Sequence, residues 1–559
     1  MEEADFTFII HNTAWYGKRY WNHIPYPEGI LTADLRRNGL KVNHIDHNVI
    51  NLFDDYSRKL ASMSEKEGDR FIEEDLERRV AELNPKIVGI SAMTIEYSKQ
   101  IHKTAEIVKR VNPKTVVVTG GIYPSLSPEP VYADSNFDII VSREAEQRIS
   151  PLVDAIKHGL PLDRIRGISY RSNGGWVHTT KEDKIMNLDS LPWPDYSDYD
   201  MKHLTHWTQK YTQNFQFRHP PHSVVMTSRG CPYHCNYCAA GKDMNPLGWD
   251  GTVRKRSPEN VVAEIEDLNK RYGIKEVVFV DDSLLIPFPK SIAMFNLLAK
   301  KKEEGFDFHW KSNNLDIRHL RPDVLKAMKA SGCYQITFSL ESLSPNSMKR
   351  MNRRYDIGKA KEYMRSMREF DFDEICANFI IGYPGDTMDD IWENMNGADE
   401  LINKEGLLDY ALFSIATPLP GTQLLEDALK GGYLPEDFDS QKFYGFGRGL
   451  ITTEEFTPEI LMNVRALEWD RMNFKTQSQR EKVAKMCGIT MKELYAWRKD
   501  TRESAGVEVK TADRADVSLP TGDIRDGDIK FEFNGAPVKE SGKSRCSDNH
   551  HGQVVLSCG

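Results

Sequence analysis

The sequence predicts an α/β protein with two consecutive parallel sheets, followed by a helical region and a polar tail. Short apolar, β-prone runs alternate with helical stretches from residue 6 to residue 141, and the alternation resumes at residue 223. Such alternation is typical of right-handed βαβ crossovers. Beyond residue 430 it gives way to helical spacing alone. The first series predicts a doubly wound, Rossmann-like sheet, and the second predicts a partial (βα)6 barrel of the TIM type.

Five strands and the helices between them are expected in the N-terminal part. The strands are predicted at 6–10, 42–46, 87–91, 115–119 and 138–141. Their apolar runs have the form that strands buried on both faces take. The helices are predicted at 30–38, 65–83 and 98–111. Ligands of such sheets bind at the carboxyl ends of the strands, so the residues that follow these strands are binding-site candidates.

Six further strands, each followed by a helix, are expected in the second series. They are predicted at 224–227, 276–280, 309–313, 335–340, 377–381 and 411–416. Polar and glycine-rich groups follow several of them, among them Asp281-Asp282, Glu341-Ser342 and Gly382-Tyr383. Active sites of such barrels lie at the carboxyl ends of the strands. We therefore expect a site on that face.

These patterns divide the chain into five segments. We expect a first domain at 1–150, a linker layer at 151–222, a barrel at 223–430, a helical cap at 431–505 and a mostly disordered tail at 506–559. The linker layer contains a predicted hairpin around Asn173-Gly174-Gly175. The cap would lie over the barrel mouth, where substrate specificity would reside. The tail is rich in Gly, Ser, Asp and Lys, which is typical of disorder.

The composition is that of a soluble globular protein. Of 559 residues, 40% are hydrophobic and 28% charged, so two or three domains are expected. The net charge of -9 offers no basic surface for nucleic acid, which is not expected as a partner. No apolar run approaches the ~20 residues of a membrane span, and the N-terminus lacks a signal-peptide pattern. Eight cysteines without framework spacing predict a reducing, cytoplasmic location.

Three of the eight cysteines form a tight trio. Cys231, Cys235 and Cys238 follow a Cys-x3-Cys-x2-Cys pattern. Zinc sites usually combine two Cys-x2-Cys pairs into a closed tetrahedral set, and no second pair lies nearby. Three thiolates from one loop suit a four-iron cluster whose fourth iron stays open for a ligand. A zinc site completed by His234 or by a distant cysteine is the alternative.

This trio, with the aromatic Tyr237 before its last cysteine, resembles the signature of the radical S-adenosylmethionine superfamily. The resemblance implies that Cys231, Cys235 and Cys238 hold a [4Fe-4S] cluster whose open iron binds S-adenosylmethionine. It also implies reductive cleavage of S-adenosylmethionine to a 5'-deoxyadenosyl radical. The positions expected to bind S-adenosylmethionine by this comparison are Tyr237, Asp281, Asp282, Ser339, Glu341 and Gly382.

Each of these positions has an implied contact and a simpler alternative. The two aspartates would meet the methionyl amino group, Ser339 and Glu341 the methionine and ribose, and Gly382 and the Tyr237 backbone the adenine. Taken singly, a carboxylate can cap a helix and a glycine can serve a turn. Their order after Cys238 favours the superfamily interpretation. Lys311-Ser312-Asn313-Asn314 departs from the arginine that the family often has in its third strand.

The N-terminal domain resembles the cobalamin-binding domain of one radical S-adenosylmethionine subclass. The resemblance implies cobalamin contacts at the strand ends, from Ser91, Thr94, Gly120, Gly121, Tyr123 and Glu144. The glycine pair would let the backbone approach a bulky ligand closely. The Asp-x-His-x-x-Gly motif is absent, which implies cobalamin without a histidine below the cobalt. Ser142-Arg143-Glu144 replaces the usual Gly-Glu-Gly, and ordinary βα turns are the alternative for all these loops.

Together these resemblances imply a cobalamin-dependent (class B) radical S-adenosylmethionine methyltransferase. Its substrate would be a small molecule, methylated at an unactivated carbon or phosphorus centre. Segments 417–422 and 468–474 are most similar to phosphonate and natural-product methylases. A flavodoxin or ferredoxin would supply electrons. A radical cyclase or oxidase of the same architecture and a non-catalytic cobalamin or iron-sulfur binding protein are the alternatives. The sequence identifies neither the substrate nor a catalytic residue beyond the cofactor ligands.

Overall fold

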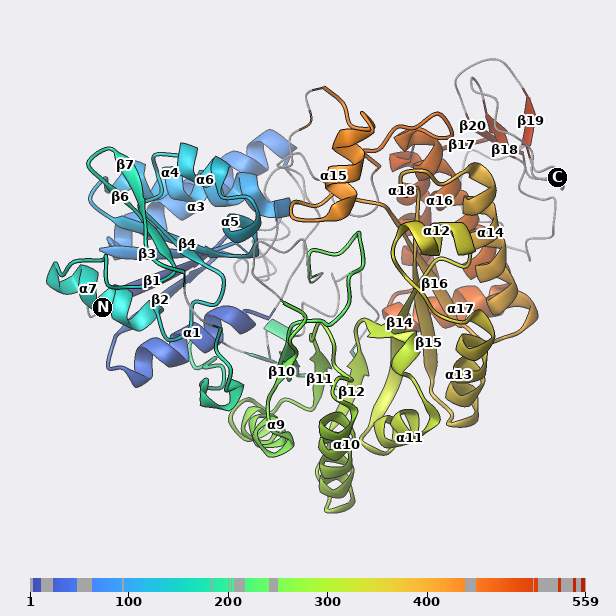
Figure 1. The fold of residues 1–559 in the computed structure, drawn as a ribbon, viewed down its shortest axis with the longest axis horizontal. Helices are drawn as coiled ribbons and strands as arrows, with labels where there is room; N and C mark the ends of the chain where they lie inside the picture. The colour runs from blue at the N-terminus through green and yellow to red at the C-terminus, as the bar shows by residue number, and fades with distance from the viewer. Residues whose placement is uncertain are drawn as a thin grey trace.

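The computed structural model places two α/β domains side by side, with helices closing the far side of the second (Figure 1). It describes residues 4–11, 24–47, 63–92, 95–181, 184–199, 201–202, 204–205, 217–240, 250–436, 438 and 449–505, and four short segments at 507–510, 531–533, 546–548 and 554–557. In Figure 1 the first domain runs from blue to teal and the second from green to orange.

The first domain contains a seven-stranded sheet in the order β2-β1-β3-β4-β5-β6-β7. Its strands are β1 (Phe6–Ile10), β2 (Val42–Asp46), β3 (Ile87–Ser91), β4 (Val116–Gly121), β5 (Ile139–Ser142), β6 (Ile168–Ser172) and β7 (Gly175–His178). The first five are parallel, as the apolar runs predict. The pair β6–β7 is antiparallel and continues the sheet at its edge. The hairpin predicted in the linker layer therefore joins the first sheet.

Helices cover both faces of this sheet. They are α1 (Tyr26–Arg37), α3 (Glu65–Leu83), α4 (Ser98–Val111), α5 (Ile122–Leu126), α6 (Glu129–Ala133) and α7 (Ile149–His158). Apolar side chains of α3 and α4 pack on one face, and those of α1 and α7 pack on the other. Burial on both faces explains why the strands read as continuous apolar runs. The doubly wound arrangement is confirmed.

The second sheet has six parallel strands in the order β16-β15-β14-β12-β11-β8. They are β8 (His222–Val225), β11 (Glu276–Phe279), β12 (His309–Ser312), β14 (Cys333–Glu341), β15 (Glu374–Ile381) and β16 (Tyr410–Ile415). The short strand β13 (Leu315–Asp316) pairs with β14, and β9 (Ser228–Arg229) pairs with β10 (Arg254–Lys255) in a separate ribbon. These six strands form the predicted partial barrel.

Helices alternate with these strands and pack against them in the largest apolar core. They are α9 (Pro258–Tyr272), α10 (Phe288–Glu303), α11 (Pro322–Ala330), α12 (Pro345–Arg350), α13 (Ile357–Glu369), α14 (Met388–Asp399) and α15 (Gln423–Lys430). Because each helix returns the chain to the same end of the sheet, the carboxyl ends of all six strands meet on one face.

The open side of the barrel is closed by three C-terminal helices, α16 (Pro458–Asn473), α17 (Gln477–Cys487) and α18 (Met491–Ser504). The helix α16 lies along β16, the last strand of the sheet. The amide of Asn473 accepts a hydrogen bond from Ala411 N at 2.8 Å and donates one to Ala411 O at 3.0 Å. Arg465 donates to Phe413 O. Side chains of α16 thus bond backbone groups along the edge of β16.

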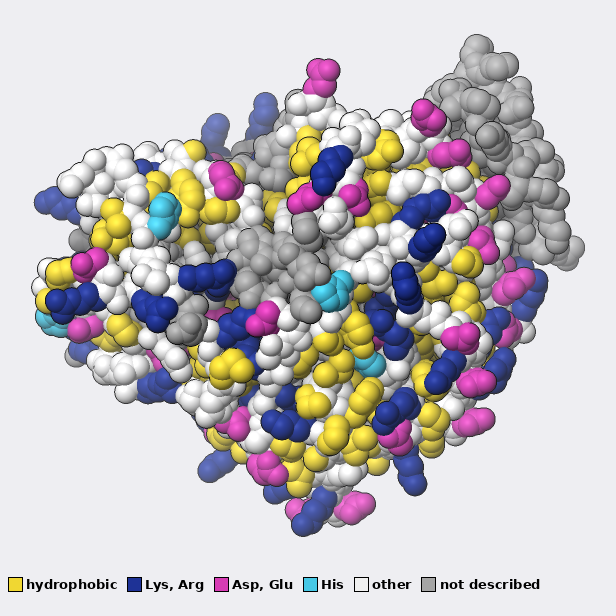
Figure 2. Space-filling view, in the orientation of Figure 1, with side chains coloured by type: hydrophobic (Ala, Val, Ile, Leu, Met, Phe, Trp, Pro, Cys, Tyr) yellow, Lys and Arg dark blue, Asp and Glu magenta, His cyan; other side chains and the backbone are white. Residues whose placement is uncertain are grey.

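Four short strands lie in the segment predicted to be a disordered tail. They are β17 (Val507–Lys510), β18 (Phe531–Phe533), β19 (Cys546–Asp548) and β20 (Val554–Ser557), and they pair in one sheet. The rest of the predicted tail lies outside the described residues. Among the residues that are described, no helix is long and apolar enough to cross a bilayer. On the face drawn in Figure 2, acidic and basic side chains are interspersed.

Candidate active site at the barrel mouth

The loop that carries the three cysteines begins directly after β8, and we call residues 227–238 the cluster loop. Asp281, at the end of β11, accepts hydrogen bonds from Thr227 N at 2.9 Å and from Thr227 Oγ1 at 2.7 Å. It also accepts one from Ser228 Oγ. Gly230 has φ +95°, and a Cβ there would lie 2.4 Å from Thr252 O. Only glycine fits this tight turn before the first cysteine.

The second half of the cluster loop is held by the segment after α12 and by the start of α15. Asn236 N donates to Met351 O at 3.0 Å, and Asn236 Nδ2 donates to Arg350 O at 2.8 Å. Asn236 O accepts from Leu424 N at 2.9 Å. Three hydrogen bonds to two separate elements therefore fix the backbone between the second and third cysteines.

The three cysteine side chains are partly exposed, as ligands of a cofactor open to substrate should be. Burial raises the pKa of Cys231 to about 11 and that of Cys238 to about 12, so both are neutral thiols until a cation compensates them. In the described part of the chain no three His, Cys, Asp or Glu side chains are close enough to hold one metal ion. Three soft sulfur donors on one loop fit an iron-sulfur cluster, whose irons separate its thiolates.

The two aspartates predicted to bind S-adenosylmethionine follow β11 and accept hydrogen bonds from different residues of the cluster loop. Asp281 holds the start of the cluster loop, as described. Asp282 accepts a hydrogen bond from Gly230 N at 3.2 Å. Asp281 Oδ2 is buried and has no hydrogen-bond partner among the described residues. Acceptor atoms of both residues thus remain available beside the loop.

The remaining predicted positions lie at the ends of β14 and β15. Tyr237 donates its hydroxyl hydrogen bond to Glu341 Oε1 at 3.0 Å, and Glu341 has φ +67°. Ser339 Oγ donates to Asn314 Oδ1. A Cβ on Gly382, which has φ +77°, would lie 2.4 Å from Leu461 Cδ1 of α16. The structure therefore gathers all six predicted positions around the carboxyl ends of the barrel strands.

Two arginines of this site lie outside the set of residues that the sequence predicts. Arg353 donates to Asp316 Oδ2 at 2.8 Å and to Ser339 O at 2.9 Å. Arg318 donates to the same Asp316 carboxylate at 2.9 Å. Although burial acts to raise the pKa of Asp316, the two arginines hold it well below its usual range. Burial raises the pKa of Glu341, and Arg353 opposes that shift.

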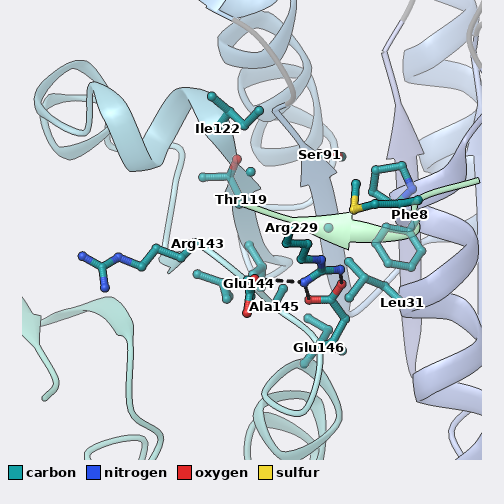
Figure 3. Close-up of a pocket in the computed structure, with 18 of the residues that line it drawn as sticks. Phe8, Leu31, Ser91, Thr119, Ile122, Arg143, Glu144, Ala145, Glu146 and Arg229 are labelled. Atoms are coloured by element: carbon teal, nitrogen blue, oxygen red, sulfur yellow. Dashed lines mark hydrogen bonds and ion pairs between the residues drawn. The ribbon is translucent and has the colours of Figure 1, made fainter. Parts of the chain in front are cut away.

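A cavity of about 380 Å³ lies at the carboxyl edge of the first sheet and reaches the second domain (Figure 3). Of the residues expected to contact cobalamin, Ser91, Gly120, Gly121 and Glu144 line it. Thr94 lies outside the described residues. Phe8 and Leu31 line the cavity on one side, Arg143 and Glu144 line it on the other, and Glu146 lies between them (Figure 3). The barrel contributes Met226, Ser228, Arg229, Arg254, Val280 and Asp282.

Tyr123 is not among the residues that line this cavity. Its side chain is 1% exposed, and its hydroxyl lies 2.9 Å from His102 Nε2, while His102 Nδ1 lies 2.6 Å from Asp134 Oδ2. The helix α5 begins at Ile122 and turns Tyr123 into the apolar core instead. The expected cobalamin contact from this residue is therefore not supported by its position.

The glycine pair at the end of β4 also has a structural role within the sheet. A Cβ on Gly120 would lie 3.0 Å from Val141 O, and one on Gly121 would lie 2.7 Å from Ala92 O. Gly121 has φ +107°. Both Cβ positions point at the backbone of neighbouring segments. These glycines therefore allow close packing within the sheet edge, while their backbone forms part of the cavity wall.

Ion pairs join the cavity wall to the cluster loop, and we call Glu144, Glu146, Arg229 and Arg254 the interdomain latch. Arg229 and Arg254 are directly opposite each other in the β9–β10 ribbon. Glu144 lies 3.2 Å from Arg229 Nη1 and 2.6 Å from Arg254 Nη2, and Glu146 pairs with Arg229 (Figure 3). Like charges opposite each other repel, so the acids of the first domain stabilise this ribbon of the second.

A pH-dependent contribution to stability is expected from Asp386, four residues after Gly382. Burial raises its pKa to about 6, against hydrogen bonds from Ser347 and Tyr383 N. Because the buried carboxyl is more stable when protonated, it contributes to the free energy of unfolding. The contribution is complete below the unfolded pKa near 3.8 and is lost as the pH rises through 6. Between pH 4.5 and pH 7.5, the free energy of unfolding of Asp386→Asn, measured with urea, should therefore rise by about 2 kcal/mol relative to that of the wild type. Exposed Asp389→Asn should show no such gain.

Fold and site define an enzyme with an iron-sulfur loop at a barrel mouth and a second cofactor domain beside it. The family model "Radical SAM superfamily" matches residues 225–398, and "B12 binding domain" matches residues 23–153. Cobalamin-dependent S-adenosylmethionine radical enzyme OxsB, solved with aqua-cobalamin bound, is 18% identical, with a TM-score of 0.62. That likeness covers 90% of this chain and 72% of OxsB, and shows the shared fold.

Several curated proteins are similar in sequence. An uncharacterized methyltransferase of Pyrococcus horikoshii is 31% identical over 64% of this chain and 73% of its own length. The cytidylyl-2-hydroxyethylphosphonate methyltransferase of Streptomyces wedmorensis is 23% identical over 65% and 71%. The anaerobic magnesium-protoporphyrin IX monomethyl ester cyclase of Rubrivivax gelatinosus is 26% identical over 66% of this chain and 63% of its own length.

The chain belongs to the family of cobalamin-binding radical S-adenosylmethionine enzymes. Its class is that of the cobalamin-dependent radical S-adenosylmethionine methyltransferases. The cofactors of the family are a [4Fe-4S] cluster, S-adenosylmethionine and cobalamin. The alternative of a non-catalytic binding protein is therefore wrong.

Proposed function

We propose that this enzyme transfers a methyl group to an unactivated carbon or phosphorus centre of a small molecule. The observation that carries the proposal is the cavity whose wall comes from the strand ends of both sheets. Arg229, at the start of the cluster loop, and Asp282, which is hydrogen-bonded to that loop, both line the cavity. A substrate that reaches both cofactor sites would lie at this shared wall.

Each cofactor has its own residues in this proposal. Cys231, Cys235 and Cys238 would hold the cluster, and Ser91, Gly120, Gly121 and Glu144 would contact cobalamin. Tyr237, Asp281, Asp282, Ser339, Glu341 and Gly382 would surround S-adenosylmethionine. When bound, the cluster supplies an electron, S-adenosylmethionine a radical and a methyl group, and cobalamin carries the methyl group.

The protein's own contribution is to bind, orient and shield. Asp281 and Asp282 offer carboxylate oxygens to an ammonium group, and the partly buried Tyr237 and the buried Glu341 close one side of the site. The latch keeps the cavity wall against the cluster loop. Apolar residues such as Phe8 and Leu31 line the cavity and would help to exclude water from it.

A phosphonate or natural product is the substrate class we favour, because a phosphonate methyltransferase is among the similar proteins. The segment 468–474, which resembles such methylases, does not itself supply a free substrate contact. Arg471 pairs with Glu468 at 2.6 Å and with Asp399 at 2.8 Å, and Asp470 pairs with Arg502 at 2.6 Å. These buried pairs stabilise the cap helices. Substrate contacts would come from other residues at the barrel mouth.

A radical cyclase is the second candidate, because a cyclase is also among the similar proteins. Product stoichiometry separates the two. A methylase consumes S-adenosylmethionine both as methyl source and as radical source, so S-adenosylhomocysteine and 5'-deoxyadenosine should form in near-equal amounts. A cyclase uses it only as radical source and should form little S-adenosylhomocysteine.

The experiment uses the cofactor-loaded enzyme, a reductant, methyl-labelled S-adenosylmethionine and candidate phosphonates and natural products. Equal amounts of both products, with label in the substrate, support the methylase. A consumed substrate with deoxyadenosine alone rules it out in favour of the cyclase. The same assay with flavodoxin or ferredoxin as reductant tests the proposed electron donor. A cytoplasmic location, which would keep the cysteines reduced, is part of the same proposal.

A further inference from the structure

The segment 350–353, at the end of α12, is hydrogen-bonded to the cluster loop at several points. Besides the two bonds from Asn236 to Arg350 O and Met351 O, Asn352 Nδ2 donates to His234 O at 2.8 Å. Asn352 itself has φ +53°, a conformation that asparagine tolerates better than most residues. The segment 350–353 therefore lies directly against the backbone of the loop that contains Cys235.

Arg353 ends this segment and is almost fully buried, with 4% of its surface exposed. One Nη donates to Asp316 at 2.8 Å and the other to Ser339 O at 2.9 Å. Its Nε is buried and has no hydrogen-bond partner among the residues that the structure describes. A buried guanidinium with an unused donor is costly unless a negative group nearby benefits from its charge.

The charge of Arg353 is not balanced by its ion pair alone. Asp316 accepts from Arg318 as well, at 2.9 Å, so two guanidinium groups share one carboxylate. Besides the carboxyl groups of Asp316 and Glu341, Tyr237 and Cys235 of the cluster loop are close enough to interact with Arg353 electrostatically. Buried charges are poorly screened by solvent and salt, so this positive charge acts on the loop at close range.

We propose that Arg353 is a positioning residue whose buried positive charge raises the reduction potential of the iron-sulfur cluster. In the step concerned, one electron leaves the external donor and enters the cluster, whose negative charge increases by one. A nearby positive charge stabilises the more negative form, which makes the electron easier to add. Arg353 thus assists reduction without touching substrate.

The test is a redox titration of the reconstituted full chain, followed by electron paramagnetic resonance, without S-adenosylmethionine. Arg353→Met removes the charge at similar length and should shift the potential to more negative values, with unchanged iron content per chain. Arg353→Lys keeps the charge but loses the planar fork, so its potential should stay near wild type even if its melting temperature falls. A purely structural role would move both variants alike.

Arg354→Met is the matched control, because Arg354 is the exposed neighbour and loses the same formal charge. Its potential should match wild type. The proposal is overturned if Arg353→Met leaves the potential unchanged, if Arg353→Lys or Arg354→Met shifts it equally, or if a shift appears only with S-adenosylmethionine bound. If Arg353→Met does not fold, Arg353→Gln carries the same expectation. A variant without iron would instead count against the cluster assignment, so the two failures are distinguishable.

Discussion

Replacing Cys231, Cys235 and Cys238 together by alanine is expected to abolish iron binding and 5'-deoxyadenosine formation. The loop then offers no soft sulfur donor, and no other cysteine of the described chain lies in it. Wild-type protein reconstituted without oxygen should hold about four irons and absorb broadly in the visible region. The triple variant should show neither property.

The control for this experiment is the double variant Cys546→Ala, Cys558→Ala in the polar tail. It removes two thiols far along the chain and should leave the iron content unchanged. Retention of iron by the triple variant would show that the cluster loop is not the iron-binding site. Loss of iron in the tail variant would indicate that the tail takes part.

Glu144→Ala is expected to destabilise the protein by about 3 kcal/mol, because it leaves the buried guanidinium of Arg254 without its carboxylate partner. The substitution leaves Arg229 and Arg254 opposite each other with Glu146 as their only latch acid. Chemical unfolding of the chain without cofactors should show the loss as a lower midpoint. Cobalamin retention should fall as well, because the cavity wall would separate from the cluster loop.

Glu82→Ala is the matched control within the same domain. Glu82 pairs with Arg78 on the surface, where both side chains are more than half exposed. Exposed pairs contribute only about 0–1 kcal/mol, so this variant should unfold almost as wild type does. If Glu144→Ala loses no more stability than Glu82→Ala, the latch does not hold the domains together.

Much of the fold and part of the site follow from local sequence patterns. The strands were predictable because burial on both faces makes each a continuous apolar run. The parallel order then brings their carboxyl ends together, which is why Ser91 and Glu144 could be assigned to one cavity, and Asp282 and Glu341 to one barrel mouth. These predictions needed only the chain direction and the connection rules.

The rest depends on contacts between distant segments. Arg254 meets Glu144 only because two domains dock, and nothing in either neighbourhood signals the pairing. Arg353 follows a short helix rather than a strand, so the strand-end rule overlooks it. Tyr123 follows β4 as the rule requires, but the helix that starts at Ile122 turns it inward. Side-chain direction beyond a strand end is set by tertiary packing, which a single sequence does not reveal.

The contacts between α16 and β16 have a consequence for association between molecules. A six-stranded sheet that does not close leaves its last strand with unpaired N–H and C=O groups, a template onto which another chain can add a strand. By bonding both backbone groups of Ala411, the amide of Asn473 takes the place of the missing seventh strand. Arg465 does the same at Phe413 O. The helix thereby protects the barrel edge against intermolecular β-pairing and aggregation.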